Sequence, residues 1–133
     1  MNDVTTRFKL PRNPNRKRER KDNRPGMSEK YLTQIRRLPS CVSWGFPVEA
    51  HHLKIKAERG VGMRATDKWA LPLTPQEHRE LERLGSRREE AWFVARGIAC
   101  YQLAEALWAQ NHSIEAMYSV LLAHFHNPEK MHD

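Results

Sequence analysis

The chain has 133 residues, with 23 Lys and Arg against 16 Asp and Glu and a formal net charge of +7 at pH 7. This length fits one domain with a modest core and is too short for two. No apolar stretch reaches the length that crosses a bilayer, and no apolar run follows the basic N-terminus. We therefore expect no membrane span, no secretory signal and a cytoplasmic location.

The positive charge is concentrated at the N-terminus. Residues 1–30 hold ten Lys or Arg against four Asp or Glu, whereas the remainder is nearly balanced. Because residues 1–27 also contain few apolar side chains, we predict a disordered basic arm there and a folded domain at 28–133. Such an arm suits nucleic acid, and a solubilising tail is the alternative. The arm residues expected to contact DNA are Arg16, Lys17, Arg18, Arg20 and Lys21.

The first predicted elements of the domain are a short helix and a β-hairpin. Residues 28–38 are predicted to form a short helix or a turn, which Pro39 ends. The run 41–52 predicts a hairpin, with its turn at 45–47 and its second strand at 48–52. Residues 54–68 read as a basic loop. Residues 69–73 are predicted to form a short apolar segment, which Pro72 limits to an edge strand or an irregular strand.

The strongest helix signals begin at Thr74. Thr74 is a candidate N-cap, Pro75 fits the first helical position, and Glu77 completes a capping box. Gly85 then ends a helix at about residue 84.

Three more helical segments follow. Ser86 and Glu89 repeat the capping-box pattern, and Gly97 closes that helix. The segments 98–110 and 113–124 repeat apolar residues at helical spacing. Together these elements predict an α+β fold. The residues expected to face inward are Ala99, Leu103, Ala106, Leu107, Ile114, Met117, Leu121 and Leu122.

Two histidines in a strand and a His–Glu pair on a helix suggest a metal site. His51 and His52 are consecutive, so their side chains point to opposite strand faces. His78 and Glu82 are one helical turn apart and share a face. Together with a strand histidine they could hold one divalent ion and leave open positions, as catalytic sites do. The alternative is an ordinary polar helix beside a chance histidine pair.

Four short motifs occur in a fixed order along the chain. They are IRRLPSC at 35–41, PVEAHHL at 47–53, GVGM at 60–63 and DKWALPLTPQEHREL at 67–81. This run, which continues to about residue 110, resembles the HNH, or ββα-metal, nucleases and is closest to a phage-associated branch of unknown function. The resemblance implies a β-hairpin plus helix motif, followed by two or three helices.

The resemblance also implies a role for each residue of the candidate site. His51 would ligate the metal, and His52 would be the general base that activates water. His78 would be the second ligand, and Glu82 the third, at a position where relatives often carry His. A carboxylate there favours Mg²⁺ or Mn²⁺, with Zn²⁺ or Ni²⁺ as alternatives.

The chain departs from the family at its structural zinc. Relatives often carry two Cys pairs, or a Cys pair and a Cys/His pair, that bind this ion. Here Cys41 has Trp44 at the spacing of its partner, and no Cys-x-x-Cys pair occurs. We therefore expect no structural zinc. Packing by Trp44, Phe46 and Trp69 would take its place, while Cys100 is read as a small core residue.

The middle Asn of the HNH signature is also missing. Asp67 is the nearest polar candidate to orient His52. The C-terminal histidines His112, His124, His126 and His132 are interpreted as exposed residues rather than as a metal-binding tract.

These patterns predict a metal-dependent DNA endonuclease, of phage or prophage origin, with double-stranded DNA as the favoured substrate. One alternative is a nucleic-acid-binding protein on a degenerate HNH fold. Another is a small phage protein that acts through a partner such as a recombinase. The loop cations expected to hold the DNA backbone are Lys54, Lys56, Arg59, Arg64 and Lys68.

Overall fold

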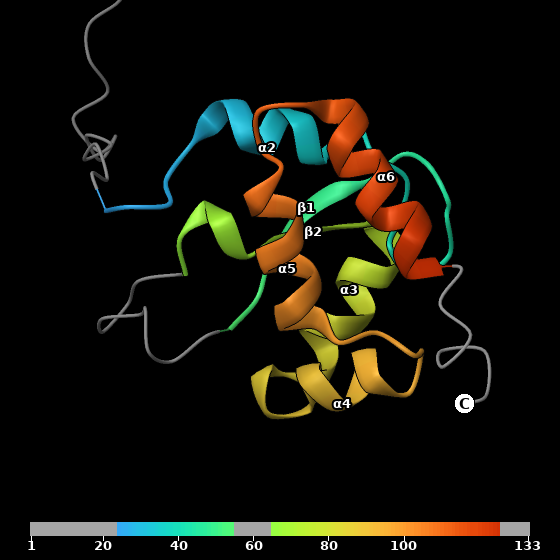
Figure 1. The fold of residues 1–133 in the computed structure, drawn as a ribbon. Coiled ribbons are helices and arrows are strands. Elements are labelled where there is room, and N and C mark those ends of the chain that lie inside the picture. The colour runs from blue at the N-terminus through green and yellow to red at the C-terminus, as the bar shows by residue number, and fades with distance from the viewer. Residues whose placement is uncertain (1–23, 55–64, 126–133) are drawn as a thin grey trace, which may run out of the picture.

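A computed structural model describes residues 24–54 and 65–125 and shows the predicted α+β fold (Figure 1). Its sheet has two antiparallel strands, β1 (Glu49–His52) and β2 (Ala70–Leu73). The helices within the described residues are α2 (Glu29–Ile35), α3 (Pro75–Leu84), α4 (Glu89–Val94), α5 (Cys100–Ala109) and α6 (Ile114–Phe125), with short 3-10 helices η2 (Asp67–Trp69) and η3 (Ser86–Arg88). The predicted disordered arm lies almost entirely outside the described residues.

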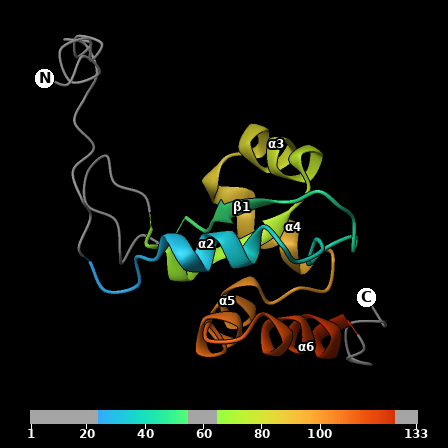
Figure 2. The ribbon, with the colours of Figure 1, turned by 90° about the horizontal axis from the view of Figure 1, so that it is seen from above.

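The small sheet lies between α3 on one side and the α5–α6 pair on the other (Figure 2). Helix α2 contacts both strands, and all four residues of β2 are buried. The core therefore forms around β2, with side chains from every layer. Its largest fully buried apolar members are Tyr31, Ile35, Leu38, Leu53, Leu71, Leu73, Phe93, Leu107, Met117 and Leu121. Of the helices described, none combines the length and apolarity needed to cross a bilayer.

The predicted capping signals of α3 are confirmed, and α2 is capped as well. The Ser28 hydroxyl accepts a hydrogen bond from the Tyr31 amide at 3.1 Å. Thr74 Oγ1 accepts from the Glu77 amide at 3.2 Å, and Glu77 Oε1 accepts from the Thr74 amide at 2.8 Å. Gly85 ends α3 with φ 86°, a left-handed conformation that glycine adopts without steric strain.

The predicted hairpin within residues 41–52 is wrong, because β1 pairs with β2. His51 lies opposite Leu71 and His52 lies opposite Ala70. The segment before β1 instead forms a turn. In this turn the Ser40 hydroxyl accepts hydrogen bonds from the backbone amides of Val42 and Ser43. A serine side chain that binds nearby backbone donors in this way competes with strand pairing.

The predicted capping box at the start of α4 is also wrong. Residues 86–88 form η3, and α4 begins only at Glu89. The N-cap position is Arg88, which makes no side-chain capping bond. The Glu89 side chain cannot serve as the box glutamate because it is buried and bonded to residues near the end of β1.

The two C-terminal helices bury a narrower stripe than predicted. Leu103, Leu107, Met117 and Leu121 are buried, as expected. Leu122 is 39 % exposed, because it lies about 100° around the helix from Leu121. Ala99, the N-cap residue of α5, and Ala106 on that helix are both exposed. The buried stripe is completed by Cys100 and Ala104.

Aromatic packing joins the segment before β1 to α6. Trp44 meets Tyr118 and Phe125 edge-on, with ring centroids 5.6 and 4.6 Å apart. Trp69 packs edge-on against Tyr101, at 6.4 Å. The role predicted for Phe46 is wrong, because its side chain is 64 % exposed.

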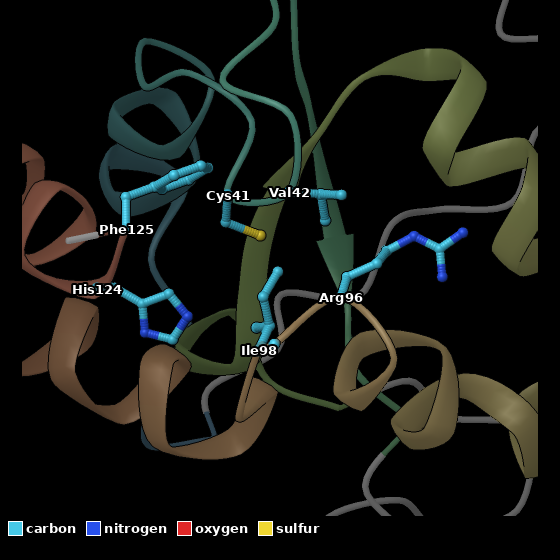
Figure 3. Close-up of a pocket in the computed structure, with 7 residues that line it drawn as sticks. Cys41, Val42, Arg96, Ile98, His124 and Phe125 are labelled. Atoms are coloured by element: carbon cyan, nitrogen blue, oxygen red, sulfur yellow. The ribbon is translucent and has the colours of Figure 1, made fainter. Parts of the chain in front are cut away.

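A hollow of about 290 Å³ lies between the end of α6 and the segment that joins α4 to α5 (Figure 3). The Cys41 sulfur points into it, and Ile98 and Phe125 supply apolar walls. Cys41 and Cys100 are both buried. The interpretation of Cys100 as a core residue is confirmed.

The Glu77 carboxylate connects the start of α3 to the turn before β1. Ser40 Oγ donates to Glu77 Oε1 at 2.6 Å. Burial raises the pKa of Glu77, but hydrogen bonds from Ser40, Ser43 and Thr74 outweigh it, and the pKa lies below its ordinary value. A carboxylate with a lowered pKa stabilises the fold above its unfolded pKa. That contribution is lost as the pH falls through the folded-state pKa.

We predict that Glu77→Gln lowers the free energy of unfolding by about 1 kcal/mol at pH 7, since the amide replaces a charged acceptor in the capping box. The difference from wild type should shrink as the pH falls well below 4.5, the ordinary value of this carboxyl group. Chemical denaturation across this range measures both effects, with the exposed Glu90→Gln as control. A constant difference at every pH would contradict the assignment.

The Cys100 thiol should be nearly inert in the folded protein. Burial raises its pKa to about 12, and the carboxylates of Glu89 and Glu90 act in the same direction. In a Cys41→Ser variant, a thiolate-selective reagent at pH 8 should modify Cys100 at least about a hundredfold more slowly than in denaturant, since only the thiolate reacts. Equal rates in the two conditions would show that Cys100 is neither buried nor perturbed.

Candidate metal centre

The three predicted ligands come together where α3 packs against β1. His51 is the third residue of β1 and is 1 % exposed. His78 and Glu82 project from successive turns of α3 and are more accessible. One ligand atom from each residue lies within 4.8 Å of the others, so the group could hold a metal ion. The predicted convergence of strand and helix is confirmed.

The spacing of these atoms is slightly wider than in a filled site. Ligands bound to one ion at about 2.0–2.2 Å lie roughly 3 to 4 Å apart. The buried His51 ring has little freedom, whereas the side chains of His78 and Glu82 are 27 % and 52 % exposed. Small rotations of these two side chains on α3 would therefore complete the coordination.

One nitrogen of His51 is engaged and the other is unsatisfied. Nε2 lies 2.6 Å from Glu89 Oε1, and both side chains are almost fully buried. Nδ1 is also buried and has no hydrogen-bond partner within residues 24–54 and 65–125. Buried polar atoms without a partner are rare and costly, so an unpaired imidazole nitrogen on a member of this group fits a metal ligand.

His78 is held in a similar way. Its Nδ1 lies 2.8 Å from Glu49 Oε1, and its Nε2 lies 3.4 Å from Glu82 Oε1. Each of the two candidate histidine ligands thus has a carboxylate at one nitrogen. The other nitrogen is unsatisfied in His51 and faces Glu82 in His78. Metal-binding histidines commonly donate their second N–H to a carboxylate, which orients the ring and makes it more basic.

The surroundings of the group carry an excess of negative charge. The carboxylates of Glu49, Glu82 and Glu89 all lie at hydrogen-bond or ion-pair distance from the two histidines. A cation already lies near them, because Lys54 Nζ is 3.7 Å from Glu82 Oε1. A divalent ion would meet favourable electrostatics here, and it would compete with Lys54 for Glu82.

His52 lies on the opposite face of β1 and is bound to Asp67. Its Nε2 is 2.8 Å from Asp67 Oδ1. The second oxygen of Asp67 accepts a hydrogen bond from the Ser28 amide at 2.8 Å, and this carboxylate is 2 % exposed. The predicted contact between Asp67 and His52 is confirmed. The role of His52 as a base stays a prediction.

The His52 face of β1 and the side chains of α3 meet in one hollow of about 320 Å³. His52 lines it together with His78 and Glu82, so the candidate base and two of the candidate ligands share this space. Arg36 and Lys54 bring positive charge to the same hollow. The full lining is Glu29, Leu32, Arg36, Ala50, His52, Lys54, His78 and Glu82.

Most of the predicted DNA-binding cations lie outside the described residues. These are Lys56, Arg59 and Arg64 of the loop, together with Arg16, Lys17, Arg18, Arg20 and Lys21 of the arm. Lys68 is described, and its Nζ lies 4.7 Å from the centre of the Trp69 ring rather than at the hollow.

The C-terminal histidines are only partly described. His112 is exposed, as interpreted. His124 is half-buried and lines the other hollow, between the end of α6 and the segment that joins α4 to α5. His126 and His132 lie outside the described residues.

Three residues of the site were missed by reasoning from the sequence. Glu49 precedes His51 by two residues and therefore shares its strand face, a signal that alternation alone could have supplied. Glu89 is 38 positions from His51, and Arg36 comes from α2. No local pattern connects either of them to the site.

No known protein family, curated protein or solved structure matches this chain.

We predict that the protein binds one Mn²⁺ per chain and that Glu82→Ala or His78→Ala weakens this binding at least about tenfold, because each removes one of three donors. Calorimetric titration measures the affinity. His112→Ala, which changes an exposed histidine away from the group, is the matched control. Equal affinities in all four proteins would exclude this centre.

Proposed function

We propose that this chain is a metal-dependent DNA endonuclease that hydrolyses phosphodiester bonds by HNH-type chemistry. The observation that carries the proposal is the shared hollow. It brings the Asp67-bound His52 next to His78 and Glu82, which belong to the candidate ligand group with His51. A general base beside a metal group is the arrangement that metal-assisted phosphodiester hydrolysis requires.

The order of the elements supports the same proposal. Strands β1 and β2 and helix α3 follow one another along the chain and pack together, which makes a ββα unit. The histidine pair ends its first strand, and the His–Glu pair lies on its helix. These are the positions that the resemblance to ββα-metal nucleases assigns to the base and the ligands.

One group of residues would bind the metal ion, and a second group would activate water. His51, His78 and Glu82 would hold a divalent ion, which when bound supplies positive charge to a phosphate oxygen and to the departing 3′ oxygen. Asp67 accepts the Nε2 hydrogen of neutral His52, so the basic lone pair lies on Nδ1. An imidazole suits proton abstraction from water because its ordinary pKa is near neutrality.

Two cations at the hollow would hold the DNA backbone. Arg36 and Lys54 both line it, and guanidinium and ammonium groups are the usual protein partners of phosphate. Lys54 would exchange its contact with Glu82 for a phosphate oxygen when a metal ion and DNA are both present.

We predict that the protein nicks supercoiled plasmid with Mg²⁺ or Mn²⁺ and that His52→Ala lowers the rate about 10²- to 10⁴-fold, the usual contribution of a general base. Metal affinity should remain near the wild-type value, because His52 is outside the ligand group. Gel analysis measures nicking, with Zn²⁺ and Ni²⁺ as further metals and His112→Ala as the control. A His52→Ala variant that nicks at the wild-type rate would remove His52 from the mechanism.

A second candidate function is nucleic-acid binding without cleavage. It is favoured by the charge of residues 1–30, which carry ten of the 23 Lys and Arg. Plasmid retarded in a gel but left uncut with every metal would support this function and contradict the nuclease. Retardation that weakens steeply with salt would assign the binding to phosphate contacts.

A further inference from the structure

Glu89 connects two parts of the chain that are distant in sequence. It is the first residue of α4, yet its carboxylate reaches the end of β1. Its Oε1 lies 2.6 Å from His51 Nε2, and its Oε2 accepts the Lys54 amide hydrogen at 2.8 Å. Its side chain is 3 % exposed. Both oxygens of this buried carboxylate are therefore engaged by defined partners.

These contacts determine which nitrogen of a neutral His51 carries hydrogen. A carboxylate only accepts hydrogen bonds, so His51 must donate from Nε2. Its lone pair then lies on Nδ1, the buried atom that lacks a partner within the described chain. The hydrogen-bonding pattern thus prepares Nδ1, and not Nε2, for a ligand.

We infer that Glu89 is a positioning residue, which holds His51 in the Nε2–H tautomer and so makes Nδ1 the metal-binding nitrogen. This inference rests on the metal centre of the proposed function. Glu49 would select the opposite tautomer in His78, because it binds Nδ1 and leaves Nε2 facing Glu82. The two ligand histidines would then be in opposite tautomers.

A purely structural role for Glu89 makes different predictions. As a simple connection between α4 and β1, it would contribute stability through the Lys54 amide and the His51 ring without influencing metal binding. Truncating the Glu89 side chain would not separate the two roles, because the buried groups left unpaired would lower stability in either case. An isosteric change in hydrogen-bonding character separates them.

Glu89→Gln is such a change. Glutamine replaces one of the two carboxylate oxygens with an NH₂ donor, so its two end atoms cannot both accept, one from Lys54 and one from His51. The Lys54 amide can only donate, whereas a neutral imidazole can move its hydrogen to the other nitrogen. The amide oxygen should therefore bind Lys54, and the NH₂ group should donate to His51 Nε2. Nδ1 would then carry the hydrogen and could not bind metal.

The test combines ¹⁵N NMR of the histidine rings with Mn²⁺ affinity, both on the full chain. Metal-free wild type should show His51 as the Nε2–H tautomer and His78 as the Nδ1–H tautomer. Glu89→Gln should show His51 as Nδ1–H and bind Mn²⁺ at least about 10- to 100-fold more weakly, the usual effect of losing an outer-sphere partner. Glu90→Gln, an exposed neighbour on α4, should match wild type in both measurements.

Several outcomes would overturn the inference. Wild type with hydrogen on His51 Nδ1 would do so without any variant. A folded Glu89→Gln protein with unchanged tautomer and affinity would leave Glu89 a structural residue, even if its stability fell. Loss of plasmid nicking is not part of this test. A tautomer switch with weakened Mn²⁺ binding in a protein that never cuts DNA would sustain the inference and refute the nuclease.

Discussion

The antiparallel pairing of β1 with β2 determines which way the two adjacent histidines of the candidate site point. It places His51 opposite Leu71, a fully buried residue, and so directs this imidazole into the interior. The same register puts His52 on the other strand face, within reach of Asp67 in η2. Because side chains alternate along a strand, a shift by one residue would exchange the two histidines and destroy both arrangements.

Each of the three histidines at this site is held by a carboxylate. His51 is bound to Glu89, His52 to Asp67 and His78 to Glu49. In every case the carboxylate occupies a ring nitrogen, which limits rotation of the ring and selects a tautomer when the imidazole is neutral. Rigid groups of defined hydrogen-bonding character are what a catalytic or metal site needs, because poorly held ligands lose both affinity and rate.

The carboxylates differ in how strongly the fold depends on them. Glu89 and Asp67 are buried, and each also binds a backbone amide, at Lys54 and Ser28 respectively. Breaking a buried pair of this kind typically costs about 3–5 kcal/mol, since one group is left uncompensated. Glu49 is half exposed, so its contact with His78 contributes much less to stability. Substitution of Glu89 or Asp67 should therefore change both the stability of the fold and the geometry of the site, whereas substitution of Glu49 should change mainly the geometry of the site.

The sequence by itself determined the features that depend on neighbouring residues. The capping box of α3 and the shared face of His78 and Glu82 follow from local geometry, because helix periodicity and capping involve residues within four positions. The resemblance to a known family pointed to His51 and Asp67. The pairing of β1 with β2 and the contact of Glu89 with His51 were decided only by the tertiary structure. Both join residues many positions apart, and the burial that makes them favourable exists only once the chain has folded around β2.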